Sequence, residues 1–142
     1  MRRISIFGFL LLGLAFLGCG GGGGGNSGPS DPGGTALIAI VFSVGSGTSD
    51  EVVLSFDGRE VARSQACSAR GPACALTATV SGVRRGGHSV VLRVNRQSQA
   101  AMAYSFLGEV DYSDNSGVRS IPLQQRQVTL RVGDSVTYDI SI

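Results

Sequence analysis

Few side chains in this chain of 142 residues are candidates for chemistry. His88 is the single histidine and there is no lysine, whereas a nucleophile needs a neighbouring base before it can act. His88 is in phase with Val90 and Leu92, which is typical of a residue packed or hydrogen-bonded at the start of a strand. The sequence therefore predicts no catalytic residue, no cofactor and no enzyme activity.

The acidic residues give a weak metal signal. Glu109, Asp111 and Asp114 form the densest acidic cluster, and Asn115 adds another oxygen ligand of the kind that calcium takes. Their spacing is not that of a calcium loop. The remaining acids lie beside turns, as Asp57 does, where aspartate ordinarily bonds the backbone rather than facing a second acid across a cleft. We expect solvated loops and no metal site.

The basic residues are unevenly distributed. The formal charge of +2 comes entirely from Arg2 and Arg3, so the rest of the chain is neutral and has no electrostatic basis for binding nucleic acid. Residues 59–96, however, contain seven arginines and a single acid. Such residues mostly form a solvated face on a β-sandwich. The alternative is a patch for an anionic glycan or lipid, made of Arg84, Arg85, Arg93 and Arg96.

The amino-terminal segment has the two physical parts of a secretory signal. Arg2 and Arg3 supply positive charge, and Ile4 to Leu17 form an apolar run of 14 residues, within the range of about 7–15 that such signals use. A helix needs roughly 20 residues to span a bilayer, which disfavours a permanent transmembrane anchor. The arginine pair also stands directly after Met1, which disfavours twin-arginine export.

The segment Phe16-Leu17-Gly18-Cys19 resembles the lipobox of bacterial lipoproteins. The resemblance implies that Cys19 receives a diacylglyceryl group, that signal peptidase cuts before it, and that the new amino terminus is usually acylated too. Two or more acyl chains anchor a protein stably. Gly20, not aspartate, follows the cysteine, which in that family implies release to the outer membrane of a Gram-negative cell. The alternative is an ordinary cysteine near a cleavage site.

This interpretation divides the chain into three parts. Residues 1–18 are the expected signal peptide, and residues 19–34 are the lipidated cysteine and a flexible, glycine-rich tether with a root-mean-square span of roughly 20 Å. Glycine tracts also cradle phosphates, but that use requires a following helix and a lysine or a serine or threonine at fixed spacing, and the chain has no lysine. Residues 35–142 remain as one domain, large enough to hold a core.

The other two cysteines are then expected to pair. With Cys19 acylated, Cys67 and Cys74 are the remaining pair, and an oxidising exterior permits a disulfide between them. Closing this loop would stabilise the fold by roughly 2.5 kcal/mol on the chain-entropy model. Two free thiols are the alternative. A cysteine pair with this spacing and one histidine do not make a zinc site.

Alternation of apolar and polar residues predicts strands along the whole domain. The expected inward-facing sets are Leu76, Ala78 and Val80; His88, Val90, Leu92 and Val94; Met102, Tyr104 and Phe106; Val128, Leu130 and Val132; and Val136, Tyr138, Ile140 and Ile142. The segment from Ala36 to Val44 is almost continuously apolar, which predicts a strand covered on both faces. Tyr112 is the one aromatic residue expected in a loop, which weakens a sugar-binding hypothesis based on stacking.

Turn signals separate these strands. Asp57-Gly58 and Gly133-Asp134 predict hairpin turns, and Asp114 to Gly117 interrupts a further pair of strands. Seven to nine strands at regular spacing, with no helical period, predict two antiparallel sheets packed as a sandwich.

Two segments resemble bacterial immunoglobulin-like and fibronectin-like modules. Gly82 to His88, followed by alternating valine and leucine, resembles a corner of these modules, and Leu130 to Tyr138 resembles their last hairpin. The resemblance implies an all-β fold, a single antiparallel immunoglobulin-like β-sandwich after the signal peptide and linker. The antibody-type core is absent because the chain has no tryptophan.

These features predict an envelope-anchored lipoprotein whose β-sandwich is non-catalytic and acts as a spacer or protein-interaction module. Its expected partners are the membrane, through the acyl chains, and an envelope protein or glycan. The expected location is the outer membrane, facing the periplasm or the cell surface. The alternative function is a binding module for anionic glycan or lipid through the arginine-rich face, with salt-sensitive binding.

Overall fold

The computed structural model of the protein describes residues 32–49, 51–71 and 73–142. The predicted signal peptide, Cys19 and most of the predicted tether lie outside these residues. The strands of the first sheet, sheet I, are in the order β6 (Cys74–Val83), β1 (Gly34–Val44), β8 (Met102–Asp114) and β9 (Gly117–Leu130). Those of sheet II are in the order β10 (Ser135–Ser141), β7 (Gly87–Arg96), β3 (Glu51–Phe56) and β4 (Arg59–Arg63). Two short strands, β2 (Thr48–Ser49) and β5 (Cys67–Ser68), pair separately.

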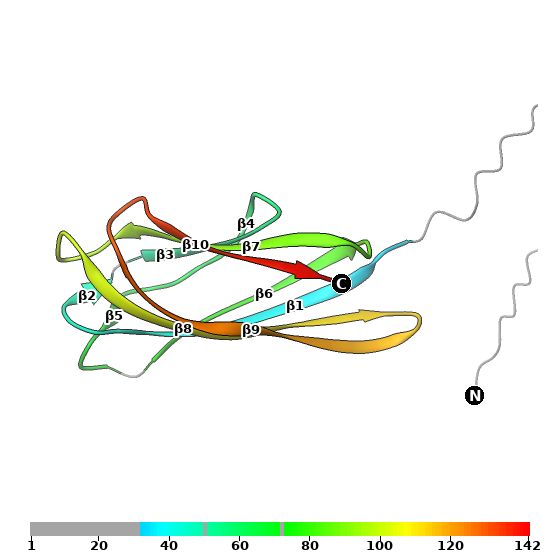
Figure 1. Cartoon of the computed structure of the whole chain (residues 1–142), viewed down its shortest axis with the longest axis horizontal. Coiled ribbons are helices and arrows are strands. Elements are labelled where there is room, and N and C mark those ends of the chain that lie inside the picture. Colours follow the sequence, from blue (N-terminus) through cyan, green and yellow to red (C-terminus); the bar gives the residue numbers. More distant parts are fainter. Residues whose placement is uncertain (1–31, 50, 72) are drawn as a thin grey trace, which may run out of the picture. The chain divides into compact units, whose positions relative to one another are not determined.

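The two four-stranded sheets pack face to face as a β-sandwich, and all their pairings are antiparallel (Figure 1). The predicted architecture is therefore confirmed. Strand order is a further finding: β1 lies in the interior of sheet I, between β6 and β8, whereas the first strand of an immunoglobulin constant domain lies at an edge.

The alternation of apolar residues builds the core as expected. Val136, Tyr138 and Ile140 of β10 are buried, and they face the interior together with Val90 and Leu92 of β7. At the centre, an aromatic cluster joins β1 to β8. The ring centroid of Phe42 is 5.7 Å from that of Phe106, and Tyr104 stacks on Phe106 at 5.5 Å.

The Asp57-Gly58 turn forms where predicted. Asp57 and Gly58 have φ angles of 49° and 78°, the left-handed pair that a two-residue hairpin turn with the right twist requires. The turn joins β3 to β4, and the register pairs Phe56 with Arg59.

The prediction that Ala36 to Val44 is covered on both faces is wrong. In β1 only alternate side chains are buried, and Leu37 and Val41 are 44% and 45% exposed. The strand is interior within sheet I, so it has neighbours on both edges, but among the described residues no further layer covers the outer face of that sheet. A long apolar run therefore reflects one buried face and one apolar outer face.

The predicted hairpin at Gly133-Asp134 is also wrong. A turn does form there, but it carries the chain from β9 in sheet I to β10 in sheet II. The backbone of Val94 bonds both turn residues, accepting from the Gly133 N–H and donating to the Asp134 carbonyl. Val132, expected to point inward, lies in this crossing and is 56% exposed.

Tyr112 is not a loop residue. It belongs to β8, is 3% exposed, and donates a hydrogen bond of 3.1 Å from its hydroxyl to the Val83 carbonyl oxygen. Every aromatic side chain of the described residues is thus buried.

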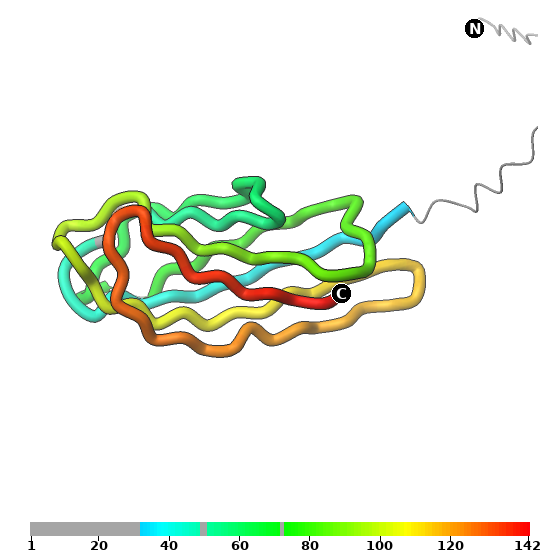
Figure 2. The backbone as a smooth tube through the Cα atoms, turned by 45° about the horizontal axis from the view of Figure 1, so that its top comes forward, coloured from blue at the N-terminus to red at the C-terminus, as the bar shows by residue number. Residues whose placement is uncertain are grey.

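Tyr112 also fixes where the chain enters the sandwich. A Cβ atom on Gly34 would overlap the Tyr112 ring and the Ser113 carbonyl oxygen, so only glycine fits there. Gly33 has a φ of 72° and packs equally closely on Gly82. We call this the entry end of the sandwich; it comprises the start of β1, the β6–β7 loop and the β8–β9 turn (Figure 2).

Candidate functional site

Cys67 and Cys74 form the predicted disulfide, with their Cα atoms 6.1 Å apart. The bond joins the short strand β5 to the start of β6, at the end of the sandwich opposite the entry end. Cys67 is buried and belongs to the hydrophobic core. The disulfide therefore links β5 to β6 at the edge of the core and has a structural role. Cys19, the predicted lipidation site, lies outside the described residues.

The four arginines of the predicted anion patch lie in two separate places. Arg84 and Arg85 are exposed in the loop before β7, at the entry end, whereas Arg93 and Arg96 lie in the second half of β7. At about 3.3 Å of rise per residue, the length of strand between the two pairs is roughly 30 Å. The structure does not bring all four side chains together.

Arg93 and Arg96 lie in a network of bonded polar groups on sheet II. Arg93 donates to Asn95, Asn95 donates to Glu51, and Arg96 lies 3.7 Å from the other carboxylate oxygen of Glu51. Arg63 also pairs with Glu51. Glu51 thus offsets part of the positive charge of Arg63 and Arg96, whereas Arg93 bonds an amide oxygen.

The entry end holds a second ionic cluster. Arg85 donates to one carboxylate oxygen of Asp114 at 3.0 and 2.8 Å, and the other oxygen accepts bonds from the Ser116 hydroxyl and backbone N–H. The Ser116 bonds, followed by that of Arg85, lower the pKa of Asp114 to about 2. Asp114 therefore closes the β8–β9 turn as a fixed anion, and Arg85 ties the neighbouring loop to it.

Two depressions flank this ionic cluster. One, of about 280 Å³, is lined by Gly33 together with Arg85, Asp114 and Ser116. The other, of about 130 Å³, places Arg119 of β9 beside Arg85. Arg119 is not among the residues predicted for the anion patch, because nothing in the sequence shows that β9 begins beside the β6–β7 loop.

His88 joins the β3–β4 turn to the β6–β7 loop. Its Nδ1 lies 2.7 Å from an Asp57 carboxylate oxygen and its Nε2 lies 2.7 Å from the Arg84 carbonyl oxygen, while its ring stacks on Phe56 at 5.2 Å. Both partners are hydrogen-bond acceptors, so both bonds form only when both ring nitrogens carry hydrogen. The geometry therefore selects the charged imidazolium.

The electrostatics agree with this geometry. Burial opposes the charge on His88, but the bonds to Asp57 and to the Arg84 carbonyl outweigh it and raise the pKa of His88 above 6.5. Burial raises the pKa of Asp57, but the bonds from His88 and the Ser89 N–H outweigh it and hold that pKa below 3.8. With both ring nitrogens engaged, His88 has no nitrogen left to accept a substrate proton.

We expect the free energy of unfolding to fall by about 1 kcal/mol as the pH rises through the pKa of His88. A raised folded-state pKa gives stability that is complete below the unfolded value of 6.5 and is lost as pH rises through the folded value. Denaturant unfolding between about pH 6 and pH 9 measures this loss. Because His88 is the only histidine, His88→Gln should flatten the profile, and an unchanged profile would contradict the assignment.

The outer face of sheet I carries an apolar patch, made of Leu37, Val41 and Leu107. Val41 and Leu107 are direct cross-strand neighbours, and they are 45% and 56% exposed. Glu109 and Asp111 continue the same face toward the entry end, beside Ala39 and Leu37 in the register. An exposed apolar centre with a charged margin is typical of interaction surfaces.

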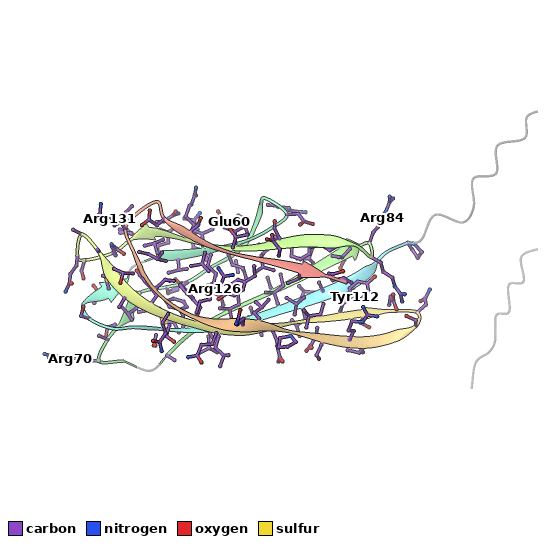
Figure 3. The ribbon with its side chains drawn as sticks, in the orientation of Figure 1. Glu60, Arg70, Arg84, Tyr112, Arg126 and Arg131 are labelled. Atoms are coloured by element: carbon purple, nitrogen blue, oxygen red, sulfur yellow. A yellow bond between two sulfur atoms is a disulfide. The ribbon has the colours of Figure 1, made fainter. Side chains whose placement is uncertain are left out.

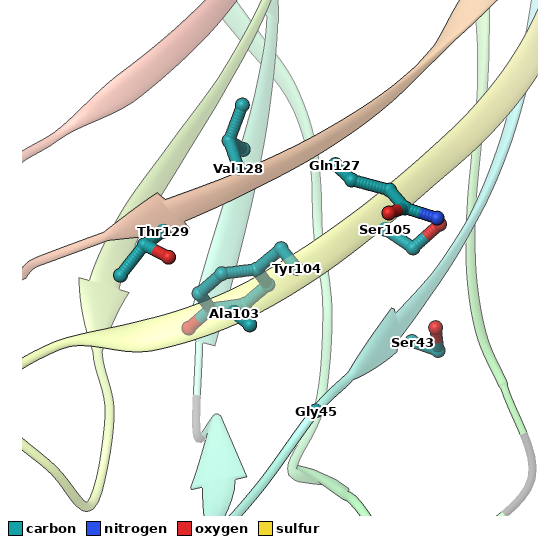
Figure 4. Close-up of a pocket in the computed structure, with 8 residues that line it drawn as sticks. All are labelled: Ser43, Gly45, Ala103, Tyr104, Ser105, Gln127, Val128 and Thr129. Atoms are coloured by element: carbon teal, nitrogen blue, oxygen red, sulfur yellow. The ribbon is translucent and has the colours of Figure 1, made fainter.

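A shallow depression lies beyond Val41 and Leu107 on the same face, toward the end opposite the entry end, which we call the far end. Figure 4 shows the residues that line it. It measures about 340 Å³, and small side chains form most of its lining on the outer face, among them Ser43, Ala103, Ser105 and Thr129. None of its lining residues carries a charge. The patch and the depression together form an uncharged area on the outer face of sheet I. The outer face of sheet II, by contrast, carries the ion pairs of Glu51.

The described residues show neither a metal cluster nor a membrane span. Within ranges 32–49, 51–71 and 73–142, no three metal-ligating histidine, cysteine, aspartate or glutamate side chains gather. Of the acids suggested for calcium, Asp111 accepts a bond from Ser120, and Asp114 is held by Ser116 and Arg85. No helix in these ranges is both long and apolar enough to cross a bilayer.

Comparison with known proteins identifies no relative of this chain. No family model matches the chain, and neither a curated protein nor a solved structure shows significant similarity to it. The fold and the surfaces described above therefore carry the functional argument by themselves.

Proposed function

We propose that the protein is an envelope-anchored lipoprotein whose β-sandwich is a non-catalytic protein-interaction module. Support for the anchor comes from the charged start, the short apolar run and Cys19 in a lipobox-like segment. The disulfide between Cys67 and Cys74 fits an oxidising compartment outside the cytoplasm. The acylated cysteine would hold the domain at the outer membrane through the glycine-rich tether.

The apolar patch of sheet I is the observation that carries the interaction role. Leu37, Val41 and Leu107 are exposed on a face that no described element covers. Exposing apolar side chains side by side is unfavourable in water, and their burial by a partner contributes about 25 cal/mol per Å². Glu109 and Asp111 beside the patch favour a protein partner that presents apolar residues next to basic ones.

Two observations favour this role over catalysis and glycan binding. His88 is engaged at both ring nitrogens, so it does not serve as a base for a nucleophile. The aromatic side chains of the described residues are buried, so they offer no platform on which a sugar could stack. The arginine-based alternative retains support only at the entry end.

Photo-crosslinking in living cells tests the interaction role. A benzoylphenylalanine at position 107 should give a discrete protein adduct, because Leu107 is the most exposed residue of the patch, at 56%. The matched control is position 137, where Thr137 is exposed on the outer face of sheet II. Val41→Asp, beside Leu107 in the register, should abolish the adduct. Equal adducts at both positions, or an adduct that survives Val41→Asp, would count against the proposal.

A further inference from the structure

The entry end carries positive charge next to an exposed apolar residue. Arg84 and Arg119 are exposed there, and Val118, the second residue of β9, is 73% exposed, more than any other large apolar residue described. Arg84 lies at this end and Arg70 and Arg131 lie at the opposite end (Figure 3). Basic residues around an apolar tip are the composition of a surface that rests on an anionic membrane.

Two acids near this end are already bonded. Asp114 is held by Arg85 and Ser116, and Asp57 is held by His88 and the Ser89 backbone. Because His88 also bonds the Arg84 carbonyl, the loop that carries Arg84 is fixed in place. Among the described residues, no ion pair joins an acid to Arg84 or Arg119.

The chain enters the sandwich at this same end. Gly33 lines a depression together with Arg85 and Asp114, and Gly34 packs against Tyr112. Only residues 20–31 separate the predicted acylated cysteine from the described chain, and a glycine-rich segment of that length spans roughly 20 Å. An anchor at Cys19 would hold the entry end within reach of the lipid headgroups.

We propose that the entry end contacts the anionic phospholipid headgroups of the membrane that holds the anchor. Arg84 and Arg119 face the headgroup phosphates, and Val118 inserts at the headgroup boundary. This contact rests on the proposed acyl anchor and goes beyond it, because it gives the sandwich an orientation. The far end is directed away from the bilayer, and the apolar patch on the outer face of sheet I stays free to meet a protein partner.

The strength of the contact follows from charge and tethering. Each arginine near an anionic surface changes the equilibrium about fivefold. The tether makes the contact intramolecular, so a weak attraction suffices to populate it. Arg84→Gln combined with Arg119→Gln should lower the equilibrium constant for contact about 25-fold.

Headgroup quenching of a fluorophore tests the orientation. The full lipidated protein is reconstituted in vesicles of mixed phosphatidylglycerol and phosphatidylcholine that contain a headgroup quencher. A single added cysteine carries the fluorophore, either at the entry end through Asn115→Cys or at the far end through Ala100→Cys; both positions are exposed. Vesicles of phosphatidylcholine alone provide the uncharged surface.

The expected result is strong quenching at position 115 and weak quenching at position 100 in the anionic vesicles. Arg84→Gln with Arg119→Gln, or removal of phosphatidylglycerol, should abolish the difference, whereas the matched far-end pair Arg70→Gln with Arg131→Gln should preserve it. Equal quenching at both positions, or quenching unaffected by the Arg84 and Arg119 changes, would overturn the inference.

Vesicle flotation of the same samples separates the two proposals. Protein that floats but shows no preferred end refutes the headgroup contact and leaves the anchor intact. Protein that does not float refutes the anchor, and with it the contact that depends on it.

Discussion

A Cys19→Ala variant is expected to leave the membrane fraction almost completely. The reason is that two or more acyl chains on Cys19 would supply the attachment, at about 0.8 kcal/mol per buried methylene group. Without them the apolar run from Ile4 to Leu17 has only 14 residues, too few to replace the anchor by spanning the bilayer. Fractionation of cells followed by an alkaline wash of the membranes measures the change.

The matched control removes the other two cysteines. A Cys67→Ser, Cys74→Ser variant lacks the disulfide but keeps Cys19, so it should remain in the washed membranes. A protein that stays membrane-bound after Cys19→Ala would contradict acyl anchoring, whereas release of the disulfide variant would show that folding, not lipid, controls retention.

Phe106→Ala is expected to lower the free energy of unfolding by about 3–5 kcal/mol, whereas Leu107→Ala should change it by no more than about 0.5 kcal/mol. Phe106 is fully buried between the sheets and contacts Phe42 and Tyr104, but the next residue, Leu107, is 56% exposed. Losing the Phe106 ring removes apolar burial and leaves a cavity in the core.

Denaturant unfolding of the two variants measures this difference. Since the residues are adjacent in β8, the pair is its own control for strand propensity and expression. Similar losses at both positions would mean that β8 is not half-buried as described. Leu107→Ala is expected to weaken binding of the partner although it leaves stability nearly unchanged, because the patch of sheet I is proposed to contact the partner.

The parts of the fold that were predictable depend on local pattern. Strict alternation in Val136, Tyr138 and Ile140 predicts a strand with one buried face, and that is what β10 shows. The turn at Asp57-Gly58 was also predictable from local pattern, because only a few residue pairs adopt two consecutive left-handed conformations. The disulfide followed from counting cysteines once Cys19 was assigned to the anchor.

The parts that were wrong or missing depend on long-range pairing. An apolar run such as Ala36 to Val44 is the same in sequence whether its second face is covered or open. The turn at Gly133-Asp134 carries no mark that its two strands belong to different sheets. Strand order was not predictable either, because β1 lies between β6 and β8, which are distant in sequence.

The candidate surfaces show the same limit. The local charge of residues 59–96 suggested a single arginine patch, but Arg84 and Arg85 lie before β7 and Arg93 and Arg96 lie in its second half. Arg96 also pairs with Glu51. Arg119 and Val118 reach the entry end through the β8–β9 turn. Their proximity to Arg85 is a product of topology and has no signature in the local sequence.

Acylation of Cys19 is tested by the mass of the amino-terminal peptide of the native protein, extracted from membranes with detergent. We expect a peptide that begins at Cys19 and carries a diacylglyceryl group and an amide-linked acyl chain. A peptide that begins at Met1, or an unmodified Cys19, would contradict the proposed anchor.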